Sequence, residues 1–422
     1  MRTHSAPPVT RRSMLRMIGL GGAATLIAAC SPAAPASPTT APTKPTTAPA
    51  ASPAASPAAS PAASPVAAAA ADAAPASSTT GISEAEWNNL VAAANQEGKF
   101  NIATYAGGGY RKVVEAFQAA YPGIAVEHSQ FQSSSREFVP RLLQEMKAGL
   151  KSWDVWLMPP QEQLRQTRPA GGLDPIRPSL LRADVLNDAS WVDGFEAGFH
   201  DVEQRWGYAL TVSRSQAVWI NTDMVKDGEI NTVQDLLNPK WKGKIVGADP
   251  RTRGSGFSPA MVMRLKTGND DIVRLLYKDQ EVALTTDARQ PTEAMVRGRY
   301  AISIGAVDKH ILSDFRAQGL GENLKPLVMP DVDYLSSSFN AMWLCKDALH
   351  PNAAKVWINW ALGKEAGALW GPNLEDNSRR ADVPPYDPAI AAKRGDPFII
   401  SAHETMLDEG EKTQRIASEV LN

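Results

Sequence analysis

Three short segments combine glycine or serine with arginine just before a predicted helix. They read GGGYR at 107–111, SSSR at 133–136 and RTRGSG at 251–256. Free backbone N–H groups and the positive end of the helix dipole make the start of a helix a natural site for an anion. Arginine adds a planar, charged fork that can pair with two oxygens of a carboxylate or phosphate. We therefore predict that these segments contribute to one pocket for an anionic ligand.

A simpler interpretation stays open for the first segment. Glycine and serine are common at helix starts whatever the function. GGGYR can therefore be a tight turn from strand to helix, with Arg111 directed to solvent. Under the functional interpretation, Gly107, Gly108 and Gly109 let a ligand approach the main chain, and Arg111 supplies charge.

The sequence lacks the usual signatures of catalysis and of metal binding. Its six histidines are scattered, and HETML at 403–407 lacks the second histidine of a zinc-protease helix. RGSGF at 253–257 lacks the glycine spacing of a nucleophile elbow, and no phosphate-binding loop of the GxxxxGK[ST] type occurs. Cys345 stands alone in an apolar stretch, which predicts a buried, inert thiol. We predict no catalytic residue, no metal and no cofactor.

Strands and helices alternate in the part of the chain that carries the first two segments. Strands are predicted at 99–106, 124–131 and 153–159. Helices are predicted between them, the first with the i, i+3, i+4, i+7 apolar spacing of Tyr110, Val113, Val114, Phe117 and Tyr121. Strand, helix, strand, helix and strand in this order predict a parallel, doubly wound sheet.

The same alternation returns in the second half of the chain. Strands are predicted at 243–250 and 300–306, and a strand, loop and helix at 281–298. After residue 345 the chain is expected to return to the first lobe, with one amphipathic helix at 352–370 that places Trp357 and Trp360 in the core. The fold class is therefore α/β, with two lobes that each contain a doubly wound sheet.

Residues 1–29 have the pattern of an export signal. Arg11 and Arg12 precede thirteen weakly apolar residues and then Cys30. Thirteen residues are too few to cross a bilayer of about 30 Å. TRRSMLR…LIAAC resembles a bacterial Tat signal ending in a lipobox, which implies cleavage before Cys30 and a lipid on it, although Ile27 stands where leucine is usual. The alternative is an ordinary secretory peptide with a chance cysteine.

Residues 30–81 are predicted to be a tether between the lipidated cysteine and the folded part. They are mostly Ala, Pro, Ser and Thr, with Lys44 and Asp72 as the only charges. Such a sequence cannot bury a core and favours an open chain. Residues 82–422 carry 38 basic and 44 acidic side chains, a net charge of −6. This charge argues against nucleic acid as a partner.

Three longer runs carry a resemblance to a known family. They begin WGYALTVSRSQAVWINTD at 206, TVQDLLNPKWKGKIVGADP at 232 and TEAMVRGRYAISIGA at 292. They are similar to extracellular solute-binding proteins of bacterial ABC transporters, nearest the branch of ferric-ion and spermidine/putrescine binders. The resemblance covers 82–422 and implies a type 2 periplasmic-binding-protein fold. Its first lobe would comprise 82–211 plus 336–422 and its second lobe 212–335, joined by crossing segments near 211–218 and 331–340.

Departures from the family pattern bear on the ligand. Ferric binders place two adjacent tyrosines where this chain reads VDKH at 307–310, and they often have a histidine in the first loop. Polyamine binders need clustered carboxylates, and only Asp287, Asp308, Asp331 and Asp333 are expected near the cleft. Arginine is the more frequent feature of the loops, so we predict an anionic solute: a phosphate, a carboxylate or an anionic ferric chelate.

The combined prediction is a monomeric receptor, anchored by a lipid on Cys30 at the extracytoplasmic face of the cell membrane. It would close its lobes on a small anionic solute and pass it to the permease subunits of an ABC importer. A cell-surface enzyme acting on a small anionic substrate and an adhesive surface protein are the alternatives. The predicted ligand contacts are Gly107, Gly108, Gly109, Tyr110, Arg111, Ser134, Ser135, Arg136, Arg214, Arg251, Arg253, Gly254, Ser255, Asp287, Arg289, Asp308 and Tyr334.

Overall fold

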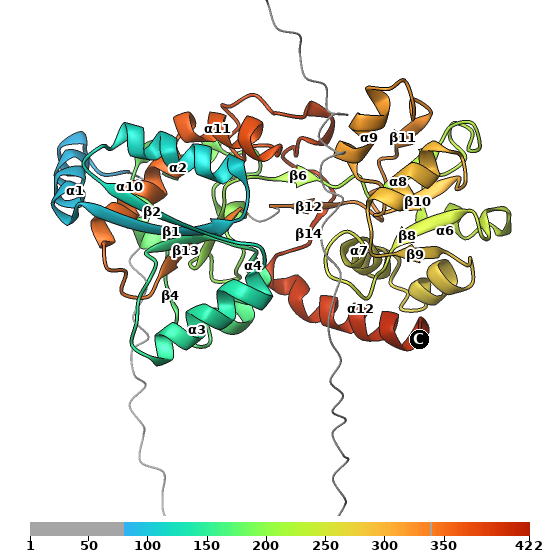
Figure 1. Ribbon diagram of the computed structural model, residues 1–422, viewed down its shortest axis with the longest axis horizontal. Helices are drawn as coiled ribbons and strands as arrows, with labels where there is room; N and C mark the ends of the chain where they lie inside the picture. Colours follow the sequence, from blue (N-terminus) through green and yellow to red (C-terminus); the bar gives the residue numbers. More distant parts are fainter. Residues whose placement is uncertain (1–79, 338–339) are drawn as a thin grey trace, which may run out of the picture. The chain divides into compact units, whose positions relative to one another are not determined.

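The computed structural model describes residues 80–337 and 340–422. The predicted signal, Cys30 and the tether up to residue 79 lie outside the described residues. Two mixed sheets, each with helices on both faces, contain most of the described strands, and a three-stranded sheet contains three more (Figure 1). The α/β fold class is confirmed.

The first sheet has the parallel part that the sequence predicts. Its order is β2 (Ala125–Phe131), β1 (Lys99–Tyr105), β3 (Val155–Leu157), β13 (Ala341–Cys345) and β4 (Leu173–Asp174), with β5 (Gly207–Ala209) paired to β13. Strand β1 is parallel to β2 and β3, whereas β13 is antiparallel to β3, β4 and β5. The sheet is therefore mixed, because the strand that returns late in the chain enters it in the opposite direction.

Helices α1 (Glu84–Glu97), α2 (Gly108–Ala120), α10 (Pro351–Ala361) and α11 (Lys364–Leu374) cover one face of this sheet, and α3 (Val139–Lys147) lies on the other (Figure 1). The predicted apolar side of α2 is buried at all four of its helical positions. The ring of Phe117 lies 5.0 Å from that of Trp357 and 5.3 Å from that of Trp360. The prediction that both tryptophans pack in the core is confirmed.

The single helix predicted at 352–370 is wrong, because the chain breaks between α10 and α11. The two carbonyl groups released at the break accept side-chain hydrogen bonds. Trp370 Nε1 donates to Ala361 O at 2.9 Å, and Arg380 Nη1 donates to Leu362 O at 2.9 Å. Trp370 and Arg380 lie 9 and 18 residues after the carbonyl groups that they bind. The spacing of apolar residues in the sequence alone therefore does not show the break.

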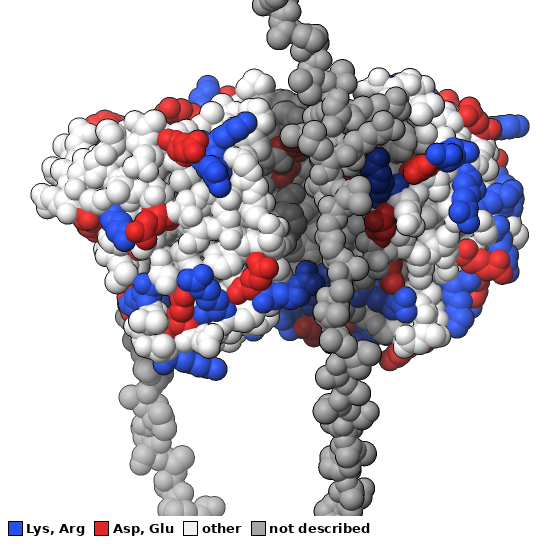
Figure 2. Space-filling view, in the orientation of Figure 1, with Lys and Arg blue, Asp and Glu red and all other residues white. Residues whose placement is uncertain are grey.

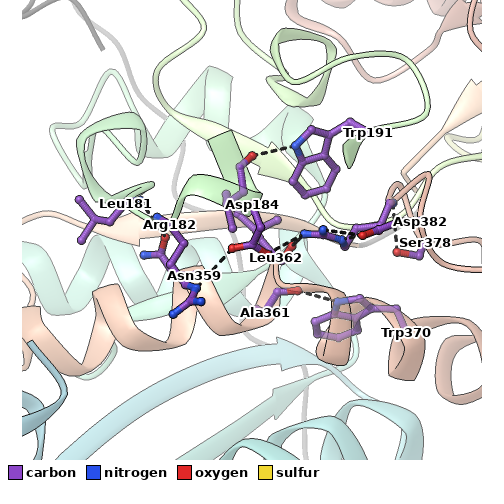
Figure 3. A network of polar contacts seen from close by, with 12 residues as sticks. Leu181, Arg182, Asp184, Trp191, Asn359, Ala361, Leu362, Trp370, Ser378 and Asp382 are labelled. Atoms are coloured by element: carbon purple, nitrogen blue, oxygen red, sulfur yellow. Dashed lines mark hydrogen bonds and ion pairs between the residues drawn. The ribbon is translucent and has the colours of Figure 1, made fainter. Parts of the chain in front are cut away.

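Arg380 also anchors the segment that follows α11. Its side chain is 3% exposed and donates to both oxygens of Asp382, at 2.8 and 3.0 Å. Asp184 lies 3.2 Å from Nη1. Figure 3 shows Asp184, Leu362 and Asp382 converging on this point. The network fixes residues 380–382 against Asp184 and the end of α10.

The second sheet has the order β11 (Leu324–Pro326), β7 (Val218–Asn221), β10 (Ile302–Ile304), β8 (Ile245–Ala248) and β9 (Ala283–Thr285). Strands β10, β8 and β9 are parallel, and β7 is antiparallel to both of its neighbours. Helices α8 (Arg289–Val296) and α9 (Lys309–Arg316) cover one face, and α7 (Phe257–Thr267) covers the other (Figure 1).

The last helix, α12 (Leu407–Val420), packs beside α7, and its Ala417 belongs to the core of the second sheet. The predicted division assigned this stretch to the first lobe. The division as a whole stays a prediction, but the contacts of α12 favour the second sheet. Remaining helices are α4 (Pro160–Glu162), α5 (Ala183–Leu186) and α6 (Val233–Leu236), with π-helical turns η1 (Ser134–Phe138), η2 (Gln163–Thr167) and η7 (Arg274–Lys278).

The two predicted crossing segments meet in the three-stranded sheet. It consists of β6 (Ser213–Arg214), β12 (Tyr334–Ser336) and β14 (Ile399–Ile400), with β12 in the middle. Strand β12 is antiparallel to β6 and parallel to β14. The sequence did not predict β14, a two-residue strand.

Candidate functional site

The carboxyl ends of the three parallel strands of the second sheet surround a cavity. Strands β8, β9 and β10 end there, and each leads through a loop into α7, α8 or α9. We call it the smaller hollow; its volume is about 250 Å³, and its lining comes from residues 248–256, 285–288 and 305–308. Ligands of open α/β sheets bind at such an edge.

A second cavity adjoins the first. This larger hollow has a volume of about 490 Å³ and is lined from β6, β12, the start of α9 and the loop after α11. Ser255, Val307 and Asp308 line both hollows. The larger hollow therefore lies among the crossing strands, the second sheet and the end of α11, where the resemblance expects a ligand.

The structure brings together six of the predicted contacts in these two hollows. Arg253, Ser255, Asp287 and Asp308 line the smaller one, and Arg214, Ser255, Asp308 and Tyr334 line the larger one. Gly254 and Arg289 adjoin lining residues along the chain and are exposed. Burial raises the pKa of Tyr334 to about 12.

Two of the predicted arginines have carboxylate partners of their own. Arg251 Nη2 lies 2.7 Å from Asp249 Oδ2, and its Nη1 donates to Leu421 O at 3.1 Å. Arg214 Nη1 lies 2.9 Å from Oδ2 of Asp333, whose side chain is fully buried. Burial raises the pKa of Asp333, while Arg214 and two backbone N–H groups act in the opposite direction. These two arginines stabilise the framework of the site.

Arg111 lies elsewhere. It lines a separate hollow of about 370 Å³ beside the edge strand β2, with Glu115, Gln118 and His128 among its neighbours, and it is absent from the lining of the two hollows above. Burial and the nearby charge of Arg111 lower the pKa of His128 to about 4. His128 Nε2 lies 2.8 Å from the hydroxyl of Thr104.

The glycine run at the start of α2 has a packing role. A Cβ atom on Gly109 would lie 1.9 Å from the carbonyl oxygen of Asn373, near the end of α11, whereas Gly108 has no heavy atom within 4 Å. Tyr110, 7% exposed, donates from its hydroxyl to Asn340 Oδ1 at 2.7 Å. Gly109 lets two helices approach closely, and Gly107 and Gly108 are exposed.

The serine segment opens η1 and α3. Ser133 accepts a hydrogen bond from Arg136 N at 3.1 Å, and buried Ser134 accepts one from Gln163 Nε2 at 3.4 Å. Ser135 and Arg136 are exposed. None of the three predicted contacts lines the smaller or the larger hollow.

Two of the three helices that begin at the smaller hollow are capped by a carboxylate side chain of this chain. Asp287 Oδ1 accepts from Gln290 N at 2.8 Å in α8, and Asp308 Oδ1 accepts from His310 N and Ile311 N at 2.9 and 3.0 Å in α9. Helix α7 differs, because its N-cap is Gly256 and no side chain caps it. In its first turn, Ser258 N donates to Gly254 O at 3.1 Å and Pro259 has no N–H group, so α7 offers the hollow the positive end of its dipole at Gly256, next to Arg253.

Sequence reasoning missed several residues that line the larger hollow. Lys309, His310, Glu375 and Asp376 are among them. His310 Nδ1 lies 2.8 Å from Glu375 Oε2, which joins the start of α9 to the end of α11. Glu375 has a φ of 54°, an uncommon conformation for a residue other than glycine. No motif marks these residues, because they come from distant parts of the chain.

Asp376 is the centre of a buried polar network at the crossing segments. Its Oδ2 accepts from the hydroxyl of Thr211 at 2.8 Å, and that hydroxyl accepts from Asn340 Nδ2 at 2.8 Å. Its Oδ1 accepts from Ser213 Oγ and from Asn377 N. The network connects the start of β6, the second crossing segment and the loop after α11.

Charged side chains of both signs lie on the face of the molecule drawn in Figure 2. On the face in Figure 2, basic and acidic side chains are intermixed over the described surface.

Cys345 is 6% exposed, and burial raises its pKa to about 12, which confirms the prediction of a buried thiol. Within residues 80–337 and 340–422, no group of three or more His, Cys, Asp or Glu side chains could hold a metal ion. No helix in this same part of the chain has the length and apolar character needed to cross a membrane.

A family model described as bacterial extracellular solute-binding protein matches residues 103–368, more than half of the chain. The chain belongs to this family. The family places it on the extracytoplasmic side and among transport proteins that bind small molecules and interact with ABC permeases. A search of curated proteins found no match.

Solved structures of the two-lobed, type 2 periplasmic-binding-protein fold resemble this solute-binding protein. Iron-bound HitA from Pseudomonas aeruginosa has 15% identity and a TM-score of 0.55, over 76% of this chain and 99% of that one. Trichodesmium IdiA (FutA) with iron and citrate has 14% identity and a TM-score of 0.59, over 76% and 99%. An ABC transporter protein from Clostridium perfringens has 18% identity and a TM-score of 0.58, over 76% and 100%. At these identities the likeness shows the fold.

Proposed function

We propose that this protein is the lipid-anchored, monomeric solute-binding component of an ABC importer and that its solute is a small anion. The observation that carries the proposal is the uncapped start of α7, which opens beside Arg253 onto the smaller hollow. A helix start without a side-chain cap presents a partial positive charge to a ligand. Because Pro259 has no N–H group and Ser258 N donates to Gly254 O, the proposal relies on this charge and on Arg253 more than on free N–H donors.

The lobes are proposed to be 82–211 plus 336–422 and 212–335, with the reservation that α12 packs on the second sheet. Closure would occur around the crossing segments that contain β6 and β12. Hinge closure around a ligand excludes water from the site and holds the cargo. Small-angle scattering should give a smaller radius of gyration at saturating ligand, and an unchanged profile would indicate a rigid pocket.

Anchoring is proposed from the sequence TRRSMLR…LIAAC and the tether that follows it. Replacing Cys30 by Ser should release a folded protein from the membrane fraction. A Cys30→Ser variant that stays with the membranes after a salt wash contradicts the anchor. Cys345→Ser is the matched control and should stay membrane-bound.

The anion could be a phosphate, a carboxylate or a ferric chelate; HitA and IdiA (FutA) were solved with iron, the latter with citrate as well. Capture of bare iron by phenolate is poorly supported in the two hollows. Tyr334 is the tyrosine that lines them among the described residues, and its raised pKa opposes ionisation. A chelate that brings its own anionic ligands fits the open helix start better.

The proposal is tested at Arg253, whose guanidinium donates to Gln161 and which lines the smaller hollow. Truncating a charged partner in a desolvated site costs about 2–5 kcal/mol, or about 30-fold and more in affinity. Arg253→Gln should show a loss at the lower end of that range, because Arg253 is exposed in this structure. Arg289→Gln is the control, since Arg289 is exposed and does not line the hollow.

The assay is calorimetry with phosphate, citrate and ferric citrate, preceded by mass spectrometry of whatever co-purifies with the chain. Equal affinity of the Arg253 and Arg289 variants contradicts the anion site, and so does a neutral sugar or a polyamine as the co-purified solute. Recovery of the solute unchanged after denaturation supports a binding protein over an enzyme.

A further inference from the structure

We infer that His310 and Glu375 form a pH-sensitive latch across the cleft, which favours its closed arrangement as the pH falls from 8 to 6. The pair joins the start of α9 to the end of α11, with Nδ1 of His310 2.8 Å from Oε2 of Glu375. The inference rests on the proposed closure of the two lobes, and it does not depend on which solute is bound.

The two residues are attached to different cores. Leu312, in the same helix as His310, packs into a core cluster of the second sheet. Leu374, directly before Glu375, packs against the main core cluster of the first sheet. Both His310 and Glu375 line the larger hollow. The bond between them therefore spans the space that the lobes would enclose, and it has to break when they separate.

Glu375 does not suit the helix that it ends. It is the C-cap of α11, with a φ of 54° and a ψ of 39°, and its N–H donates to Gly371 O at 2.8 Å. Glycine is the usual residue in this left-handed conformation, and the negative end of the helix dipole disfavours a carboxylate. The local structure of α11 therefore gives no reason for a glutamate at this position.

His310 is unfavourably placed in the opposite sense. It lies in the first turn of α9, after the N-cap Asp308, where the positive end of the helix dipole disfavours a cation. The pairing of a charged imidazole with Glu375 offsets the unfavourable interaction of each with its own helix. Departures from local rules that are compensated elsewhere in the fold are typical of functional residues.

The exposure of the pair suits a contact that opens. The side chain of His310 is 57% exposed and that of Glu375 is 49% exposed, so water can replace the bond when the lobes separate. A buried pair would resist separation, because each charge would stay without a partner. An exposed ion pair changes an equilibrium by about two- to fivefold. Such a factor shifts the balance between open and closed lobes without holding them permanently shut.

The dependence on pH follows from the histidine. Histidine ordinarily changes its charge between pH 5 and 8, and a charged imidazole donates a stronger hydrogen bond to a carboxylate than a neutral one does. The other charged or titratable side chains in the described lining of the larger hollow are Asp308 and Lys309 of α9, Arg214 and Tyr334 of the crossing strands, and Asp376 after α11. Near α9 there are also Asp314, one turn after His310, and, on the neighbouring helix α8, Arg289 and the pair of Glu293 with Arg297. Side chains of these other types ordinarily keep their charge between pH 6 and 8.

The experiment measures opening directly and needs no solute. Lys112 on α2 and Gln318 after α9 are exposed. Lys112→Cys and Gln318→Cys, in the full chain with Cys30→Ser, give one fluorophore site on each lobe, and buried Cys345 should stay unlabelled. Single-molecule energy transfer then gives the ratio of closed to open molecules at pH 6 and at pH 8.

The labelled chain is compared with three variants of the pair. In the labelled chain the ratio should be about two- to fivefold higher at pH 6 than at pH 8, and Glu375→Gln should abolish this difference. His310→Glu should lower the ratio at both pH values, because it places two carboxylates opposite each other. Adding Glu375→Lys to His310→Glu should restore the ratio and make it independent of pH, since glutamate and lysine ordinarily do not titrate in this range.

The combined exchange is expected to fold, because it places each charge at the end of the helix dipole that favours it. Glu293→Lys is the matched control. It reverses a charge in an exposed pair, with Arg297 at 2.6 Å, that lies within α8 and does not cross the cleft. This variant should leave the ratio unchanged.

A combined exchange that fails to recover the ratio lost in His310→Glu overturns the latch, and so does a pH response that persists in Glu375→Gln. An equal effect of Glu293→Lys also overturns it, since net charge would then be the cause. Two states whose ratio ignores pH in the labelled chain leave closure standing and refute the latch alone. One unchanging transfer efficiency in every chain and condition means that the lobes do not move, and then the proposed closure itself fails.

Discussion

Replacing Gly109 by alanine tests why the chain has a bare backbone at the start of α2. The added Cβ would lie 1.9 Å from Asn373 O and 2.8 Å from Asn373 C, where ordinary contacts begin at 3.4 Å. Both obstructing atoms are backbone, so the two helices would have to separate by more than 1 Å. Overpacking of this kind costs about 1–3 kcal/mol, and the better helix propensity of alanine returns at most about 1 kcal/mol.

We therefore expect Gly109→Ala to destabilise the folded state by about 1–2 kcal/mol, which is a fall of about 2–6 °C in melting temperature for a domain of a few hundred residues. Gly108→Ala is the control one residue away. Gly108 also belongs to α2, and its added Cβ would meet nothing within 4 Å. That variant should be as stable as the original chain or slightly more stable.

Scanning calorimetry on both variants, with the affinity for phosphate, citrate and ferric citrate measured in parallel, separates packing from ligand contact. A Gly109→Ala protein that keeps its melting temperature and loses affinity would show that a ligand, and not α11, approaches this backbone. Equal destabilisation by the two substitutions would also refute the packing argument, because only one of the two positions is obstructed.

Three further predictions follow from buried ionisable side chains. Burial lowers the pKa of His200 to about 3, so below about pH 6.5 the unfolded chain binds a proton that the folded chain does not, and the free energy of unfolding falls. Urea titrations should show that this free energy is about 2 kcal/mol lower at pH 5 than at pH 8. The decrease should be smaller in His200→Gln. Cys345, with its pKa raised to about 12, should resist iodoacetamide at pH 8 in the folded protein and react after unfolding. Arg214→Met should lower the free energy of unfolding by about 3–5 kcal/mol because it leaves Asp333 buried without its cation, whereas Arg297→Met, at the exposed pair with Glu293, should lower it by less than about 1 kcal/mol.

Local patterns predicted the elements well, because their causes are local. The strand expected at 99–106 is β1 (Lys99–Tyr105), and the apolar spacing beginning at Tyr110 identified the buried side of α2. The fold class followed from the alternation of such elements. The break between α10 and α11 was not predictable in this way, since it depends on hydrogen bonds from Trp370 and Arg380 to the freed carbonyls.

Six of the predicted contacts, from five separate stretches of the chain, line the two hollows, and their contact with a ligand stays a prediction. The loop 251–256 does open onto a cavity, through Arg253 and Ser255, because the strand before it and the helix after it fix its place. Arg111 has the same local pattern but lines another hollow. Glu375 and Asp376 reach the cleft through the packing of α11 and of the chain beyond it, and no spacing along the sequence indicates that contact.

The crossing strands are held at both ends by a buried carboxylate, which limits where the lobes can move. On one side, Asp376 binds Thr211 and Ser213 at the start of β6. On the other side, Asp333 accepts from Ala217 N at 3.0 Å and from Arg214 Nη1 at 2.9 Å.

Buried charge-assisted bonds of this kind are costly to break without a replacement partner. The stretches 214–216 and 334–336 are also bonded to each other: Leu335 of β12 pairs with Arg214 of β6, and Tyr334 N donates to Ser215 Oγ at 3.0 Å. The proposed closure therefore has to move them as one paired unit. Both stretches line the larger hollow. A ligand that fills this hollow would touch this paired unit, so ligand binding and the proposed closure would involve the same two strands.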